Sequence, residues 1–370
     1  MRNCYWIIFL VFITAGCGKD KEQLPAATPY HLTIPRHFPQ TLNIPADNPM
    51  TVEGIALGRY LFYDGHLSGR TQQDSLMSCG TCHIRENSFV CGINHPQFHG
   101  HPYGLTGNPT PHVMMPLINL VWNSNGYLWN GSVCKENSSA ENIEDIVWMT
   151  ITDPNEICGD TNRTKTLISS IPAYAPLFKN AFGSETVTMK NICRAIAQFV
   201  RTLVSANSKF DRFLNGEVQL DAHELKGYEL FMTEEGADCF HCHGGDGNPV
   251  FTTNLFYNNG KDAVFQDPLD RFHFTGNAAD EGSYKAPTLR NLVFRAPYMH
   301  DGRFTTLEQV IDFYSNGLVY SPSISPLMHH IDTRGVQLTP SKKADLKAFL
   351  LTLTDSSFVA NPEFGRPAGW

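Results

Sequence analysis

Two short motifs of the form Cys-x-x-Cys-His constrain this chain more than any other feature of its sequence. They occupy residues 79–83 and 239–243. With this spacing two thiols can bond to the vinyl groups of one haem while the next histidine ligates its iron. One copy would also suit half of a zinc site or a redox dithiol. Two copies, however, would arise by chance in only about one chain in ten thousand. We therefore predict a di-haem c-type cytochrome. The predicted haem-binding residues are Cys79, Cys82, His83, Cys239, Cys242 and His243.

The length and charge of the chain limit its architecture and its partners. Its 370 residues are enough for two domains of ordinary size, each with its own core. A formal net charge of -8 gives no electrostatic footprint for nucleic acid, so we expect no nucleic-acid partner. A moderately acidic surface suits a basic redox partner, and solvation alone explains it equally well.

The N-terminus has the features of an export signal. Arg2 precedes an apolar stretch over residues 4–15, which is too short to span a bilayer as a stable anchor. Residues 14–17, Thr-Ala-Gly-Cys, resemble a bacterial lipobox. We expect a signal peptide over residues 1–16, lipid on Cys17, and a tether and extended arm over residues 17–46. The alternative is an ordinary secretory signal with an incidental Cys17. Either way we expect a periplasmic protein, and with the lipid a membrane-anchored lipoprotein.

Four cysteines remain after the export signal and the haem motifs: Cys91, Cys134, Cys158 and Cys193. In an oxidising compartment they can form one or two disulfides, and Cys134–Cys158 is the first pairing we expect. The alternative is that all four are free thiols.

The patterning predicts a mainly α fold with two cytochrome c-like haem domains and long connecting loops. Residues 54–62 and 224–231 each suggest a helix ahead of a haem motif, which indicates an old duplication. We place the domains at residues 47–216 and 217–370. A helix capped by Thr188 is expected to end near residues 211–216, and another to begin at Thr339 and Pro340. The Gly- and Asn-rich residues 248–281 are expected to be loop.

Five further stretches extend the pattern beyond the haem motifs. They cover residues 48–64, 127–131, 285–291, 296–302 and 346–350. In this order they resemble the bacterial di-haem cytochrome c peroxidases and the related MauG proteins, from about residue 45 to the end. The resemblance implies that the N-terminal haem reduces hydrogen peroxide to water. It also implies that the C-terminal haem passes electrons from a small periplasmic donor, such as a cytochrome c or a cupredoxin.

The resemblance assigns residues around the first haem. The family's distal acid/base falls on Glu156, where burial would raise the carboxyl pKa into a useful range. Its distal Gln falls on Ile146, which cannot donate a hydrogen bond and has Glu144 and Asp145 beside it. The distal His of some members falls near Leu105, so we expect an open iron position in the resting ferric protein, as in the MauG-like branch. If this alignment is misplaced, the candidate ligands are His95, His99, His101 and His112, for which the ordinary surface histidine is the alternative.

Two aromatic residues acquire roles by the same resemblance. Trp129 matches the tryptophan that lies between the two haems, although without the resemblance it would be a core aromatic. Tyr314 matches the second axial ligand of the C-terminal haem in MauG proteins. Met299 and Met328 are the competing thioether ligands, and the helical spacing of Tyr314 also suits a core residue. His300 matches a position beside the haem propionates and is not expected to be a ligand.

The family often binds calcium between its domains and is often dimeric. The carbonyl groups that bind calcium in the family map to Arg295 and Pro297, but the position of its usual Asn ligand is Val113 here. Calcium binding and a homodimer are therefore left open.

The first function predicted is a peroxidase with Glu156 and Trp129 as catalytic residues. The alternatives are MauG-like oxidation of a protein or organic substrate, and a non-enzymatic periplasmic electron carrier.

Overall fold

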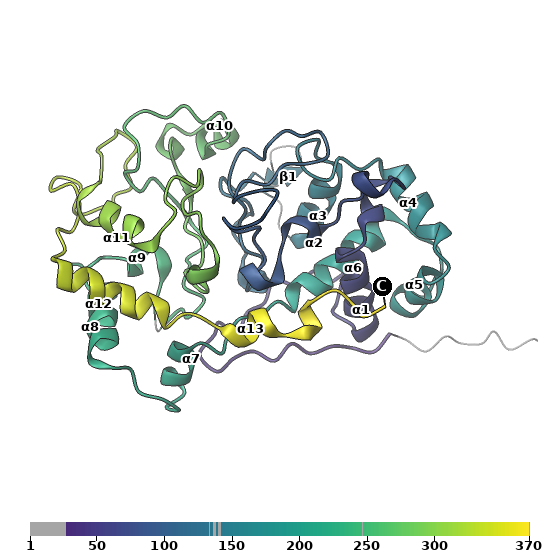
Figure 1. The fold of residues 1–370 in the computed structure, drawn as a ribbon, viewed down its shortest axis with the longest axis horizontal. Coiled ribbons are helices and arrows are strands. Elements are labelled where there is room, and N and C mark those ends of the chain that lie inside the picture. The colour runs from purple at the N-terminus through teal and green to yellow at the C-terminus, as the bar shows by residue number, and fades with distance from the viewer. Residues whose placement is uncertain (1–26, 133, 136–137, 140–141, 246, 370) are drawn as a thin grey trace, which may run out of the picture.

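The computed structural model describes residues 27–132, 134–135, 138–139, 142–245 and 247–369. The fold is mainly helical, as predicted, and Figure 1 shows two lobes side by side. Each lobe has its own hydrophobic core. The export signal and Cys17 lie outside the described residues, so both remain predictions.

The first lobe is built on two helices that cross closely. Its helices are α1 (Val52–Phe62), α2 (Cys79–Cys82), α3 (Ile143–Thr152), α4 (Thr161–Ser170), α5 (Tyr174–Phe182) and α6 (Met189–Arg201). Helix α1 packs against α6 at Gly58, where a Cβ would lie 1.9 Å from the carbonyl oxygen of Ala195. Only glycine allows the two backbones to approach this closely.

The second lobe repeats this arrangement. Its helices are α7 (Lys209–Leu214), α8 (Ala222–Phe231), α9 (Phe240–His243), α10 (Arg271–Thr275), α11 (Leu307–Asn316) and α12 (Pro340–Leu351). Helix α8 packs against α12 at Gly227, where a Cβ would lie 2.0 Å from the carbonyl oxygen of Asp345. Gly58 and Gly227 each stand four residues before a fully buried phenylalanine, Phe62 and Phe231. The two helix pairs are thus equivalent, in agreement with the predicted duplication.

Strands are short in the described residues. β1 (Cys134–Lys135) pairs antiparallel with β2 (Ser138–Ser139), and β3 (Phe256–Tyr257) pairs antiparallel with β4 (Tyr284–Lys285). The register of the second pair sets Phe256 opposite Lys285. Residues 248–281 are mostly loop, as expected, with β3 and α10 inside them.

Local capping signals marked the starts of these helices correctly, but the end of one helix was predicted wrongly. Thr188 caps α6, Thr339 caps α12, and Asp221 forms a capping box with Glu224 at α8. Helix α6, however, ends at Arg201 rather than near residue 211. A new capping box at Ser208 starts the separate helix α7, which the sequence prediction had merged with α6.

The C-terminal segment leaves the second lobe and packs on the first. After α12, helix α13 (Ser356–Ala360) inserts Phe358 into the core of the first lobe, and Figure 1 shows this segment running toward α1. Arg59 Nε donates to the carbonyl of Gly365 at 2.8 Å, and the Tyr63 hydroxyl donates to that of Phe364 at 2.6 Å. This segment belongs in sequence to the predicted second domain, residues 217–370, but it packs on the first lobe. The domain boundaries stay a prediction.

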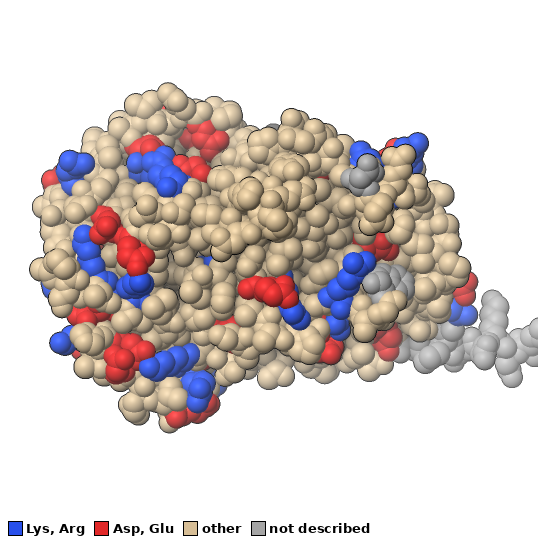
Figure 2. Space-filling view, in the orientation of Figure 1, with Lys and Arg blue, Asp and Glu red and all other residues tan. Residues whose placement is uncertain are grey.

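Three further observations concern the cysteines, membrane-spanning helices and the charged surface. Cys158 is a free thiol, so the expected Cys134–Cys158 disulfide is not formed, and Cys91 and Cys193 are free as well. Among the described residues, none of the helices is long and apolar enough to cross a membrane. Figure 2 shows basic and acidic side chains interspersed on this face, around a broad central area with few charges.

Candidate haem sites

The first haem motif forms a short helix that orients its histidine. α2 begins after Ser78, whose capping box with Thr81 fixes the turn. His83 follows at once, and its Nδ1 lies 2.6 Å from the carbonyl oxygen of Phe89. That bond places the ring proton on Nδ1 and leaves the Nε2 lone pair free. Burial lowers the pKa of His83 to about 4, so the imidazole is neutral, which is the form that ligates a metal.

A cavity of about 360 Å³ adjoins this motif. Cys79, Cys82 and His83 form part of its lining. Helix α3, the loops over residues 102–104, 110–120 and 123–132, and parts of the second lobe also line it. Glu156 and Ile146 also line it, so two positions assigned by resemblance lie on the same cavity as the first motif.

Glu156 is held by its backbone in a turn after α3. Its amide donates to the carbonyl of Asp153 at 3.1 Å, and its carbonyl accepts from the amide of Leu105 at 3.2 Å. A Cβ on Gly104 would lie 2.2 Å from that same carbonyl, so the neighbouring loop can approach only through glycine. Burial raises the pKa of the Glu156 carboxyl to about 7, and a hydrogen bond with the Thr150 side chain partly opposes the shift.

Leu105 and Ile146 stand where family members have a distal His and a distal Gln, and the structure shows where both side chains lie. Leu105 packs against the core of the first lobe and is not among the residues that line the cavity. Ile146 does line it, and the adjacent Glu144 points elsewhere, because its carboxylate pairs with the buried Arg201 at 2.6 and 2.9 Å. Glu144 is therefore committed to an ion pair. Thr150, which sequence reasoning did not single out, is the polar side chain that contacts Glu156.

Of the four alternative histidines, His112 is the one that lines the first cavity. Its Nε2 lies 2.6 Å from a carboxylate oxygen of Asp267, and its ring meets that of His300 edge-on. His95 stacks on Phe98 instead.

The second haem motif is arranged like the first. Cys239 precedes α9, which ends at His243, and His243 Nδ1 lies 3.1 Å from the carbonyl oxygen of Pro287. Burial lowers the pKa of His243 to about 4, so this imidazole is neutral as well. A cavity of about 200 Å³ is lined by Cys239, Cys242 and His243.

Tyr314 of α11 lies on this second cavity, together with Met299 and Met328. The Tyr314 hydroxyl accepts a hydrogen bond of 2.9 Å from Asn259 Nδ2. Burial raises the pKa of Tyr314, whereas the Asn259 bond opposes that rise because it favours the phenolate. Asn259 is 55 residues away in sequence, and no local signal identified it.

Three residues line both cavities: Trp129, Lys285 and Pro287. The indole Nε1 of Trp129 donates to the carbonyl of Val113 at 2.8 Å, and the Trp129 carbonyl accepts from the amide of Lys285 at 2.7 Å. Its ring centroid lies 6.4 Å from that of His300. Trp129 is thus fixed at both ends in the wall that separates the two cavities.

The residues around the second motif fit a haem. Arg295 is buried beside His243, and its Nε has no hydrogen-bond partner. Burial lowers the pKa of this guanidinium to about 10. Arg295 does not line the cavity itself, so it contributes positive charge close to His243 rather than a direct contact. The neutral His243, the two thiols of the motif and the mainly apolar lining are the features that suit a haem. For calcium, Val113 offers no side-chain oxygen, and the site stays a prediction.

Comparisons with known proteins agree on one group. A family model described as di-haem cytochrome c peroxidase matches residues 52–219. The chain is 32% identical over 317 residues to the methylamine utilization protein MauG of Methylorubrum extorquens, covering 85% of this chain and 82% of that protein. It is 33% identical over 273 residues to cytochrome c551 peroxidase of Nitrosomonas europaea, covering 73% and 75%. A crystal structure of a MauG-like protein associated with microbial copper homeostasis superposes with a TM-score of 0.78 at 33% identity, covering 91% of this chain and 99% of the other.

Proposed function

Because the chain belongs to the family of di-haem cytochrome c peroxidases and MauG proteins, we propose that it reduces hydrogen peroxide to water at the haem of its first motif. Electrons would be relayed through the haem of the second motif. One observation carries the proposal: Trp129 lines both cavities, and each cavity holds one Cys-x-x-Cys-His motif. A carrier with two independent haems would not need a shared aromatic wall.

When bound, the two haems supply the iron at which peroxide reacts and the store for the electrons. The protein contributes positioning and proton transfer. His83 and His243 present neutral imidazoles that backbone carbonyls hold in place. Glu156, with its pKa near neutral, can accept a proton from one peroxide oxygen and return it to the other. Among the described residues that line the first cavity, Ile146 stands where the family has its Gln, and Thr150 is the side chain that hydrogen-bonds to the Glu156 carboxyl group.

At the second motif, Tyr314 would supply a further protein ligand to the haem iron, as the resemblance to MauG implies. Asn259 supports this assignment, because a donor aimed at the hydroxyl stabilises the charged form that would bind iron. This observation also favours the second candidate function, MauG-like oxidation of a protein or organic substrate. A phenolate ligand would stabilise oxidised iron and lower the haem potential relative to a thioether, so the second haem would be better suited to hold oxidising equivalents than to accept electrons from a cytochrome donor.

The remaining parts of the proposal concern location and partners. A signal peptide over residues 1–16 and lipid on Cys17 would place the enzyme at the periplasmic face of a membrane. The electron donor for peroxidase activity would be a small cytochrome c or a cupredoxin. The interspersed charges in Figure 2 give a donor both signs of charge to pair with.

The test uses the purified di-haem protein in its fully ferric form. One equivalent of hydrogen peroxide is added, and both haems are followed by EPR. Joint loss of the high-spin and low-spin signals is the result expected of a first haem that accepts peroxide and a second haem that shares the oxidising equivalents. Two low-spin signals that do not respond to peroxide would contradict an open first site and favour an electron carrier. Turnover assays with a reduced cytochrome c and with an organic reductant then separate the peroxidase from the oxidase.

A further inference from the structure

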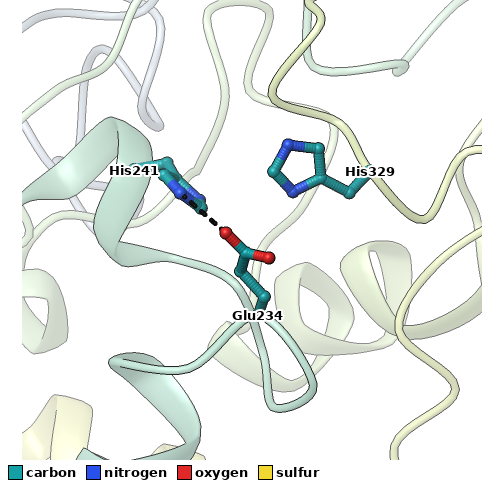
Figure 3. Close-up of side chains that lie close together, drawn as sticks. All are labelled: Glu234, His241 and His329. Atoms are coloured by element: carbon teal, nitrogen blue, oxygen red, sulfur yellow. Dashed lines mark ion pairs between the residues drawn. The ribbon is translucent and has the colours of Figure 1, made fainter.

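Three side chains that the proposed reaction does not use gather beside the second motif: Glu234, His241 and His329. Of these, His329 also lines the second cavity. Each offers one ligand atom, and these atoms lie within 4.8 Å of one another. Figure 3 shows His241 on the short helix α9, Glu234 on the turn that precedes it, and His329 on the facing loop. The proposed reaction uses none of the three, although His241 lies inside the second haem motif.

The spacing of one pair in the group, Glu234 and His241, suits two ligands of one ion better than a direct ion pair. Glu234 Oε1 and His241 Nε2 are 3.4 Å apart. A charge-assisted hydrogen bond would hold them at about 2.7–2.9 Å. Two atoms that each bind one zinc-like ion at about 2.0–2.1 Å in tetrahedral geometry lie about 3.3 Å apart. The observed separation therefore already matches two ligands of one ion.

A fourth residue, Asp238, is hydrogen-bonded to His241 and lies near His329. Asp238 Oδ1 lies 2.6 Å from His241 Nδ1, and Asp238 Oδ2 lies 3.4 Å from His329 Nδ1. A carboxylate behind the imidazole fixes the ring proton on Nδ1 and directs the Nε2 lone pair outward, the usual support of a metal-binding histidine. For His241, that lone pair faces Glu234. The Asp238 side chain is only 7% exposed, so it acts from below the surface.

The loop and the turn that carry these side chains are joined by a hydrogen bond, and the side chains remain accessible to solvent. His330 Nε2 donates to the carbonyl of Glu234 at 2.8 Å, which fastens the loop of His329 to the turn of Glu234. The side chains of Glu234, His241 and His329 are 55%, 21% and 38% exposed, so an ion can enter from solvent and keep water as a further ligand.

We propose that Glu234, His241 and His329 bind one divalent transition-metal ion, Zn²⁺ or Cu²⁺. Two imidazoles and one carboxylate match the ligand preference of these ions. Ca²⁺ prefers an all-oxygen set and is not expected to bind here.

The test uses the full-length protein with both haems attached. It is stripped with EDTA, dialysed, and titrated with Zn²⁺ and separately with Cu²⁺ by calorimetry, and metal content is counted after gel filtration. One equivalent is expected in each case, with Cu²⁺ bound more tightly than Zn²⁺. His329→Ala and Glu234→Gln should each weaken binding by at least about 10-fold. Excess Ca²⁺ should not displace the ion.

The matched control is His223→Ala. His223 also pairs with an aspartate, since its Nδ1 lies 2.6 Å from Asp345 Oδ1, but it has no place in the three-residue group. This variant should bind Zn²⁺ like the unaltered protein. Unchanged haem absorption spectra in all variants check that they are folded. Equal affinities for His329→Ala, His223→Ala and the unaltered protein, or displacement by Ca²⁺, would overturn the proposal.

Discussion

Glu156 offers the sharpest test of the proposed chemistry, through the substitution Glu156→Gln. The amide keeps the shape of the side chain but can no longer take up a proton. General acid–base catalysis is typically worth about 10²–10⁴-fold, so kcat/KM for peroxide should fall by a factor in that range. Because the carboxylate is the reactive base and the pKa of Glu156 is raised to about 7, kcat/KM of the unaltered enzyme should rise with pH around neutrality. The Glu156→Gln variant should lack this rise.

The pH dependence of the free energy of unfolding is an independent test of the raised Glu156 pKa. The rise of the Glu156 pKa from 4.5 to about 7 corresponds to about 3 kcal/mol in favour of the neutral acid in the folded protein. This contribution is fully present below pH 4.5 and is lost as pH rises through about 7. Denaturant unfolding of Glu156→Gln should therefore show a smaller loss of stability between these pH values than the unaltered protein shows.

A second substitution separates a catalytic role from a structural one. Thr150→Val removes the hydrogen bond that lowers the Glu156 pKa, so the midpoint of the pH–rate profile should move upward while activity at high pH is kept. Stopped-flow peroxide consumption across pH 5–9 measures both variants. If Glu156→Gln retains kcat/KM within a factor of two with the same midpoint, the acid/base role is refuted.

Three further substitutions test the wall, the second haem and the fold. Trp129→Phe should leave peroxide consumption at the first haem intact but uncouple the EPR responses of the two haems in freeze-quenched samples; responses that stay synchronous would exclude Trp129 from the relay. Tyr314→Phe should change the low-spin haem spectrum, and an unchanged spectrum would rule out ligation. Gly58→Ala should destabilise the protein by about 1–3 kcal/mol in denaturant unfolding. The added Cβ would lie 1.9 Å from the Ala195 carbonyl, a clash that outweighs the gain of about 1 kcal/mol in helix propensity. Gly247→Ala, which meets open space, should change stability little.

The parts of the fold that the sequence predicted are those with local causes. Caps at Thr188 and Thr339 and the repeated pattern ending in Phe62 and Phe231 depend on residues a few positions apart, and the helices begin where these signals stand. The end of α6 was missed because buried residues such as Leu203 continue the pattern of the helix past Arg201, although residues 203–207 are no longer helical.

The site was predicted where a motif or a resemblance marked it, and missed where only tertiary structure brings residues together. The haem motifs, Glu156, Trp129 and Tyr314 lie on the two cavities. Asn259 reaches the second cavity from a loop, and Lys285 reaches both cavities from the two-residue strand β4; no periodicity in the sequence encodes either path. The role of Glu144 was also hidden, because its partner Arg201 is 57 residues away.

The C-terminal segment that packs on the first lobe has a consequence for how the protein matures. Arg85, two residues after His83, donates to the carbonyl of Asn361 at 3.2 Å, so the segment lies beside the first motif. During synthesis the chain emerges from its N-terminus, and domains generally fold as they emerge. The contacts of the C-terminal segment with the first lobe, including Phe358 in its core, can form only after the second lobe has been synthesised. The side of the first motif that this segment covers would therefore be the last part of the first lobe to close.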